Sequence, residues 1–411
     1  MMTSVELMTR RNSEKSKSKE RKIFFRIKLG QKQIVIESPY SLFSDEWDRK
    51  HSVVGTPSDE SRAEFIGYIS ERLRLDIAII RGIIDRHATS TVTVDDIKRE
   101  IIADTEARKL IPFVERICDN LSLRDHIRTA ETYRASVSSF MHFYREERAF
   151  LPETLRSCPM IDDLTSDLIE SYQSYLTDKG LTRNTISFYM RTLRAIYNRA
   201  ADLDIINQHR PFRNVFTGIC RTTKRALPSN IIRRIKKLDL SGNSELEFAR
   251  DLFILSFCLR GMSFIDMAFL RKSDLRHGQL TYSRRKTGQT LTIAWTSEMR
   301  EFTKKYTSKH PCYLLPIIPP GCRRERSAYK NAGYRINSSL HRIGRMLGLV
   351  SPLTLYVARH SWASVAKAKG IPLGLISEGM GHDSEKTTRI YLSTLDNSAI
   401  DRANRLILRS I

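Results

Sequence analysis

The spacing of apolar residues changes along the chain from a strand-like to a helix-like period. Two apolar-rich runs flank Gly30 in KIFFRIKLGQKQIVIES and predict a β-hairpin. After Trp47, apolar residues at helical spacing predict an amphipathic helix with one buried face: Ile69, Leu73, Ile77, Ile80 and Ile84. Residues 21–105 are therefore predicted to form a small α+β module, and the polar, charged residues 1–20 are predicted to be disordered.

The helical period is continuous over residues 109–210. Thr165 is a typical N-cap and Gly180 a typical C-terminal stop for one of these helices. The next helix carries three cations opposite its apolar side: Arg183, Arg191 and Arg194. The pattern predicts a helical bundle with a cationic face, followed by a basic linker at residues 209–228 that we expect to act as a hinge.

Residues 226–411 are predicted to be mainly helical with one hairpin, QLTYSRRKTGQTLTIAW, whose two strands flank Thr287–Gln289. The predicted fold class is thus mainly α and multidomain: a small α+β module, a helical bundle, and an α-rich domain with a small β-hairpin.

Composition narrows the class of protein. A chain of 411 residues is too long for one hydrophobic core. No apolar run approaches the ~18 residues of a membrane helix and no secretory signal is evident, so we expect a soluble, cytoplasmic protein without a membrane partner. The six cysteines form no CxxC pair, which argues against disulfides and a structural metal. The net charge of +23 indicates a polyanionic partner, most simply nucleic acid.

Four segments in residues 226–411 carry polar groups in a distinctive order. They are CLRGMSFIDMAFLRKSDL with Arg260, the hairpin with Lys286, LTLYVARHSWASVAKAKG with Arg359 and His360, and MGHDSEKTTRIYLS with His382 and Tyr391. This order resembles that of the tyrosine recombinases, or phage integrase family, over about residues 109–405. The resemblance implies a core-binding domain at 109–210, a catalytic domain at 226–411, and an arm-binding-like module at 21–105.

The resemblance also implies a role for each group. Tyr391 would attack a DNA phosphate and form a 3′-phosphotyrosyl link, which conserves the bond for rejoining and needs no metal or cofactor. Arg260 and Arg359 would hold the charged phosphate oxygens, because guanidinium groups suit bidentate phosphate contact. Lys286 would protonate the departing 5′-oxygen as general acid, and His382 would hydrogen-bond the phosphate.

Two positions depart from the family pattern. Tyr356 stands where the family usually has His or Lys, three residues before the second arginine. The spacing of Asp266, Leu270 and Asp274 aligns the family's first arginine with Ser263, so that Arg260 lies three residues upstream. We expect Arg260 to reach the same phosphate along one helix face.

The main hypothesis is a site-specific DNA recombinase or integrase, working as a homotetramer on paired double-stranded DNA sites in the cytoplasm with the nucleoid. DNA-bending accessory proteins are further partners consistent with this hypothesis. The alternative is a catalytically impaired DNA-binding accessory protein of the same fold, which the changes at Ser263 and Tyr356 favour. A type IB topoisomerase would use similar chemistry, but the arm-binding-like module favours recombination between defined sites.

Overall fold

The computed structural model describes residues 3–11, 20–56, 59–87, 92–220, 226–382, 384–385, 388 and 407–408. It divides into two compact units, Met1–Arg221 and Thr222–Ile411. The first unit contains strands β1 (Thr3–Arg11), β2 (Arg21–Leu29), β3 (Lys32–Leu42), β4 (Trp47–Asp48) and β5 (Val53–Val54), and helices α1 (Ala63–Arg86), α2 (Val94–Arg108), α3 (Leu110–Leu123), α4 (Ile127–Glu147), α5 (Glu153–Arg156), α6 (Ser166–Asp178) and α7 (Arg183–Asp202).

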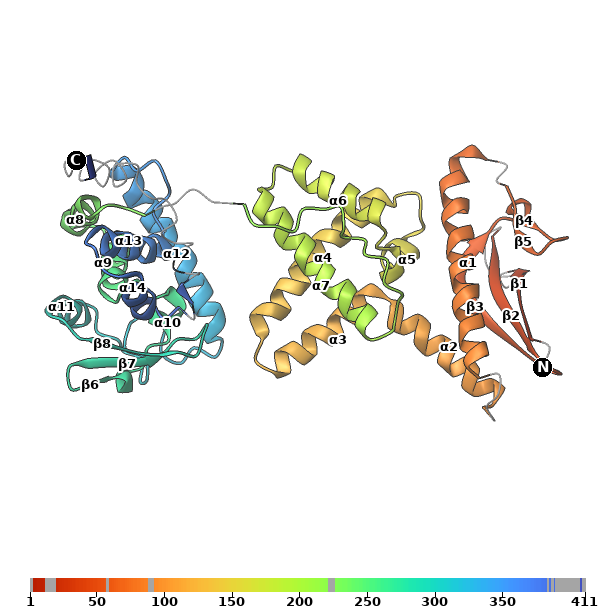
Figure 1. Cartoon of the computed structure of the whole chain (residues 1–411), viewed down its shortest axis with the longest axis horizontal. Helices are drawn as coiled ribbons and strands as arrows, with labels where there is room; N and C mark the ends of the chain where they lie inside the picture. Colours follow the sequence, from red (N-terminus) through yellow and green to blue (C-terminus); the bar gives the residue numbers. More distant parts are fainter. Residues whose placement is uncertain are drawn as a thin grey trace. The chain divides into compact units, whose positions relative to one another are not determined.

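An antiparallel sheet in the order β1-β2-β3 begins the first unit (Figure 1). The predicted hairpin is confirmed as β2 and β3, with Gly30 in the left-handed region at their turn. Ile23, Phe25 and Ile27 alternate along β2 on the buried face and share one core with the apolar faces of α1 and α2.

Strand β1 corrects the prediction that residues 1–20 are disordered. Residues 3–11 pair with β2 at nine successive positions, from Thr3 opposite Leu29 to Arg11 opposite Arg21. Val5 and Leu7 join the core of the module as partly buried side chains. The polar composition of this segment does not predict a strand. The strand is stabilised by the backbone hydrogen bonds that its pairing with β2 supplies.

Helices α3, α4, α6 and α7 form the predicted bundle around a separate core. Thr165 caps α6 by accepting from the Leu168 N–H, and Gly180 follows the helix with φ of 75°. The inward face of α7 is buried as predicted, through Ile186, Met190, Leu193 and Tyr197. Arg183 on the same helix is exposed, and Arg191 and Arg194 are half-buried.

A buried charge network joins the N-terminal module to this bundle. Arg72 of α1 is 2% exposed, and its Nη1 lies 3.4 Å from Asp163 Oδ1 in the bundle. Asp163 also accepts from the Met160 N–H at 2.8 Å. Burial raises the pKa of Asp163, and the Arg72 charge opposes this rise. Two buried groups of opposite charge thus connect the two cores of the first unit.

The second unit consists of α8 (Ser229–Lys237), α9 (Ser244–Cys258), α10 (Phe264–Ala268), strands β6 (Leu275–Arg276), β7 (Gln279–Ser283) and β8 (Thr290–Ala294), α11 (Ser297–Lys305), α12 (Glu325–Met346), α13 (Leu355–Ala368) and α14 (Leu373–Met380). Helix α9 packs against α8, α11, α12 and α13 (Figure 1). The predicted hairpin is confirmed as β7 and β8, in an antiparallel sheet of order β6-β7-β8.

The predicted fold class is confirmed, because helices dominate both units and the sheets are small and antiparallel. Among the described residues, no helix combines the length and the apolar character needed to span a bilayer.

Candidate active site

The C-terminal end of α14 gathers two buried arginines and a histidine. Gly381 ends this helix in the left-handed conformation, with φ of 65°. The carbonyl of Met380 accepts from Arg359, and the carbonyl of Gly381 accepts from Arg284. Cations are favoured here because the last carbonyls of a helix lack intrahelical donors and carry the negative end of its dipole.

Arg359 is held from two sides. Helix α13 carries it, and its side chain is 4% exposed. Its Nη1 donates to the carbonyl of Gly261 at 2.8 Å, and its Nη2 donates to that of Met380 at 2.7 Å. These contacts fix the guanidinium plane before any ligand arrives, as a preorganised phosphate site requires.

His382 follows the same helix end and is 8% exposed. Its Nε2 lies 2.8 Å from Arg359 Nη2, and its Nδ1 lies 2.7 Å from the Thr388 hydroxyl oxygen. Burial lowers the pKa of His382 to about 4, and the charges of Arg359, Arg284 and Lys286 contribute to this shift. The ring is therefore neutral at pH 7.

Arg284 is a site residue that the sequence analysis missed. It is the first residue of the turn between β7 and β8, and it is 6% exposed. Its Nη1 donates to the Gly381 carbonyl, while its Nε is buried and has no hydrogen-bond partner among the described residues. A buried guanidinium with a donor to spare beside Arg359 is suited to an anionic ligand. The only sequence signal is the Arg284-Arg285-Lys286 run, in which nothing distinguishes the buried member.

The structure corrects the expectation that Arg260 shares a helix face with Ser263. Arg260 follows the end of α9 and has φ of 58°, and Ser263 is the N-cap of α10. The Cδ of Arg260 lies 3.7 Å from the position that a Cβ on Gly379 of α14 would occupy. Ser263 instead donates to Asp266 Oδ2 at 2.5 Å. Arg260 thus approaches α14 through the turn between α9 and α10.

Three arginine charges act on the pKa of Tyr282 on β7. Burial, and next the charge of Asp266, raise the pKa of its phenol above the usual value. The guanidinium groups of Arg359, Arg284 and Arg260 act on it in the opposite direction. Their shared influence on one side chain agrees with a cluster of positive charge around the end of α14.

Lys286 occupies the turn of the hairpin and is exposed. The turn closes through the Gly288 N–H, which donates to the Arg284 carbonyl at 2.7 Å. Asp266 anchors this turn by accepting from the Arg285 N–H at 2.9 Å. The Lys286 charge contributes to lowering the pKa of His382. Of the predicted residues, Arg359 and His382 contact each other directly, Arg260 approaches the same helix, and Tyr391 lies outside the described residues.

Tyr356 and His360 lie next to each other on α13. Tyr356 is 55% exposed, and its ring meets that of His360 edge to face with centroids 4.6 Å apart. On this helix Tyr356 stands three residues before Arg359, and His360 stands directly after it.

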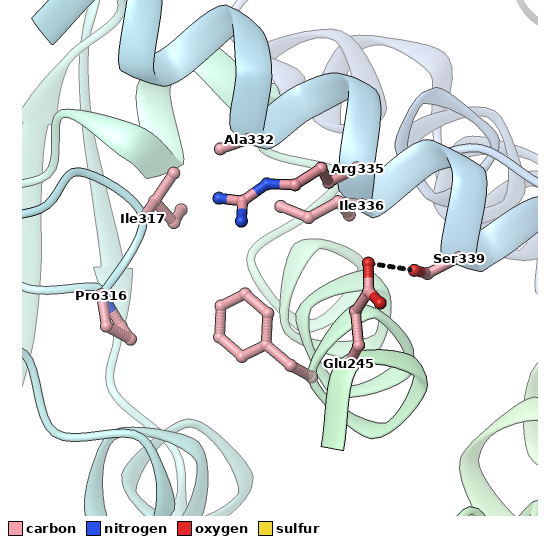
Figure 2. A pocket seen from close by; sticks show the side chains of 8 residues that line it. Glu245, Pro316, Ile317, Ala332, Arg335, Ile336 and Ser339 are labelled. Atoms are coloured by element: carbon pink, nitrogen blue, oxygen red, sulfur yellow. Dashed lines mark hydrogen bonds between the residues drawn. The ribbon is translucent and has the colours of Figure 1, made fainter. Parts of the chain in front are cut away.

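Two cavities in the second unit differ in character. An open depression of about 500 Å³ beside the hairpin is lined by charged groups that include Asp266, Arg284 and Arg285. A second cavity of about 150 Å³ lies between α9 and α12, where Ser339 donates to Glu245 and Arg335 reaches toward Ile317 (Figure 2). Since small-molecule sites usually enclose ~300–1,000 Å³, the second cavity is too small for a substrate of that kind.

Comparison with known proteins gives matches over both units. The model described as "Phage integrase SAM-like domain" matches residues 109–215, and that described as "Phage integrase family" matches residues 242–398. A "Tyrosine recombinase" of Pseudothermotoga lettingae is 23% identical over 316 residues, covering 72% of this chain and 99% of the relative. "Tyrosine recombinase XerA" of Pyrococcus furiosus is 22% identical over 282 residues, covering 59% and 96%.

A crystal structure of a lambda integrase dimer bound to a COC′ core site has a similar fold. It aligns with a TM-score of 0.51 and 14% sequence identity, covering 90% of this chain and 91% of that one.

Proposed function

Because the chain belongs to the tyrosine recombinase, or phage integrase, family, we propose that it is a site-specific DNA recombinase that cleaves and rejoins strands through a 3′-phosphotyrosyl intermediate. The observation that carries the proposal is the convergence of Arg284, Arg359 and His382 at the end of α14. Two buried guanidinium groups there are suited to hold the phosphate and stabilise the charge that develops on its non-bridging oxygens.

In the proposed reaction, the phenol oxygen of Tyr391 forms a bond to phosphorus while the bond from phosphorus to the 5′-oxygen breaks. The phenol loses its proton, and Lys286 gives a proton to the departing 5′-oxygen. The number of phosphoester bonds is unchanged, so rejoining needs no external energy source. An exposed lysine on a hairpin tip is suited to this role because it can approach the leaving group when DNA binds.

Arg260 is proposed as a third phosphate ligand that contacts DNA beside Arg284. The alternative function, a DNA-binding accessory protein without strand cleavage, is favoured by Ser263 in the position of the family's first arginine. The buried Arg284 weakens that argument, since it supplies a second guanidinium beside Arg359 from a different element.

We also propose double-stranded DNA as the partner of both units. The outer face of β2 presents Lys22, Arg26 and Lys28, which form ion pairs with Glu37 and Glu6 in the free protein, and Arg183 is exposed on α7. These cations support an arm-binding role for residues 21–105 and a core-binding role for residues 109–210. Assembly as a homotetramer on paired sites, help from DNA-bending proteins, and a cytoplasmic location with the nucleoid belong to the same proposal.

A nicked suicide substrate tests the function. We expect the wild-type protein to form a covalent protein–DNA band on a denaturing gel, and Tyr391→Phe to bind the same DNA without forming that band. Tyr334→Phe is a matched control, because Tyr334 is 76% exposed on α12 and should leave the band unchanged. A covalent band of normal intensity in Tyr391→Phe would exclude Tyr391 as nucleophile, and none in the wild type would favour the accessory-protein alternative.

A further inference from the structure

The hydrogen bonds of His382 define which ring nitrogen carries its proton. A guanidinium group donates hydrogen bonds and cannot accept them. Arg359 Nη2, 2.8 Å from Nε2, must therefore donate to Nε2, which has no proton in this arrangement. In a neutral ring the proton is then on Nδ1, which donates to the Thr388 hydroxyl at 2.7 Å.

Thr388 is placed to hold this state. Its side chain is fully buried, and its hydroxyl is the group that faces Nδ1. An acceptor at this point fixes the plane of the imidazole and keeps Nε2 directed at Arg359. In functional histidines, the hydrogen bond made by one ring nitrogen commonly determines the protonation of the other.

We propose that Thr388 is a positioning residue that keeps Nδ1 of His382 protonated and Nε2 directed at the phosphate site. The expected effect of Thr388 on catalysis rests on the proposed function. The hydrogen-bond pattern around His382 is a property of the free protein. Thr388 precedes Tyr391 by three residues, a length of chain that spans at most about 11 Å. The same hydrogen bond therefore connects His382 to the segment that carries the proposed nucleophile.

The arrangement also defines what changes when a phosphate binds. Nε2 accepts from Arg359 in the free protein, so it can donate to a phosphate oxygen only after it takes up a proton from solvent. The positive charges that act on the ring come from Arg359 on α13 and from Arg284 and Lys286 in the hairpin, and they oppose this uptake. A phosphate anion among them would favour it, while Thr388 accepts from Nδ1 in both states.

Two substitutions separate the hydroxyl from the shape of the side chain. Thr388→Val keeps the shape and removes the acceptor, and Thr388→Ser keeps the acceptor and removes a methyl group. With the suicide substrate we expect cleavage by Thr388→Val to be about tenfold to a hundredfold slower, as for loss of a buried hydrogen-bond partner, and Thr388→Ser to stay close to wild type. A packing role would give the opposite order, which would overturn the proposal.

The pH dependence gives a second readout. A charged ring gains more from the Thr388 hydroxyl than a neutral ring does, because charge-assisted hydrogen bonds are stronger. The rate of cleavage by Thr388→Val should therefore fall at a lower pH than that of the wild type as the pH is raised. An unchanged profile would mean that Thr388 acts only through packing.

Nitrogen NMR of the full-length, 15N-histidine-labelled protein tests the tautomer without DNA. The His382 signals, assigned by their loss in His382→Gln, should show a protonated Nδ1 and an unprotonated Nε2 at pH 7. Thr388→Ser should keep this pattern, whereas in Thr388→Val the ring is no longer held against Arg359 and should show a mixture of the two neutral forms. An Nε2-protonated ring in the wild type would overturn the proposal. If the wild type forms no covalent DNA complex, the proposed function fails, and this measurement still decides the role of Thr388.

Discussion

A Cβ atom on Gly261 would lie 2.6 Å from the Cα of Arg359, so the α9–α10 turn can meet α13 only because Gly261 has no side chain. The same glycine has φ of 72° and accepts a hydrogen bond from Arg359 through its carbonyl. The close approach of two backbones therefore determines where the arginine of the proposed phosphate site lies.

Gly261→Ala is expected to displace Arg359 and abolish strand cleavage, since the new methyl group clashes with backbone that cannot rotate away. Gly278→Ala is the matched control, because Gly278 has a similar φ of 74° but open space around it. Both variants should lose roughly 1 kcal/mol of stability from the left-handed conformation, and only Gly261→Ala should lose the covalent band. Equal cleavage by the two variants would contradict this role of Gly261.

Arg284→Lys is expected to retain DNA binding and to slow cleavage about 100-fold. A lysine keeps the charge but lacks the planar guanidinium that can donate to the Gly381 carbonyl and to a phosphate oxygen at once. Loss of one hydrogen-bond donor to a transition state commonly lowers the rate by about 10²–10³. Arg276→Lys on the exposed strand β6 is the control. Single-turnover rates on the suicide substrate measure the effect, and a normal rate in Arg284→Lys would remove Arg284 from the site.

Cleavage is expected to proceed at the same rate in excess EDTA. The guanidinium groups of Arg284 and Arg359 supply positive charge at the phosphate, which is a role that metal ions have in other phosphoryl-transfer enzymes. Within the part of the chain that the structure describes, no group of three or more His, Cys, Asp or Glu side chains could hold a metal ion. A strict requirement for Mg²⁺ in the cleavage step would contradict the prediction.

DNA binding is expected to weaken by at least about 10³ between 50 and 200 mM salt, as for proteins that neutralise six or more phosphates. Arg183→Ala on α7 should lower the slope of log affinity against log salt by about one unit. Arg134→Ala should leave the slope unchanged, since Arg134 is paired with Glu115 and Asp119. Gel-shift titrations at several salt concentrations measure the slope, and a flat response would contradict the proposed DNA partner.

Arg72→Ala is expected to destabilise the first unit by about 3–5 kcal/mol, because it leaves the Asp163 carboxylate buried without its counter-charge. Arg74→Ala, which removes an exposed pair with Glu71 from the same helix, should change stability little. Urea unfolding followed by circular dichroism compares the two variants. Equal midpoints would show that the Arg72–Asp163 pair does not hold the two cores together.

The sequence by itself determined the elements with a strong local period and the order of the proposed site groups. Ile69 to Ile84 and Ile186 to Tyr197 follow helical spacing, and their burial matches it because the period of a helix depends only on its backbone. Lys286, Arg359 and His382 stand in segments whose order made them candidates for the proposed site.

The tertiary structure decided the features that depend on distant partners. Strand β1 exists through its pairing with β2, and Arg284 enters the site through a carbonyl 97 residues away at Gly381. Arg260 lies in the turn after α9, where its backbone has the left-handed conformation. None of these has a local period, since each is set by packing between segments that the chain brings together only when it folds.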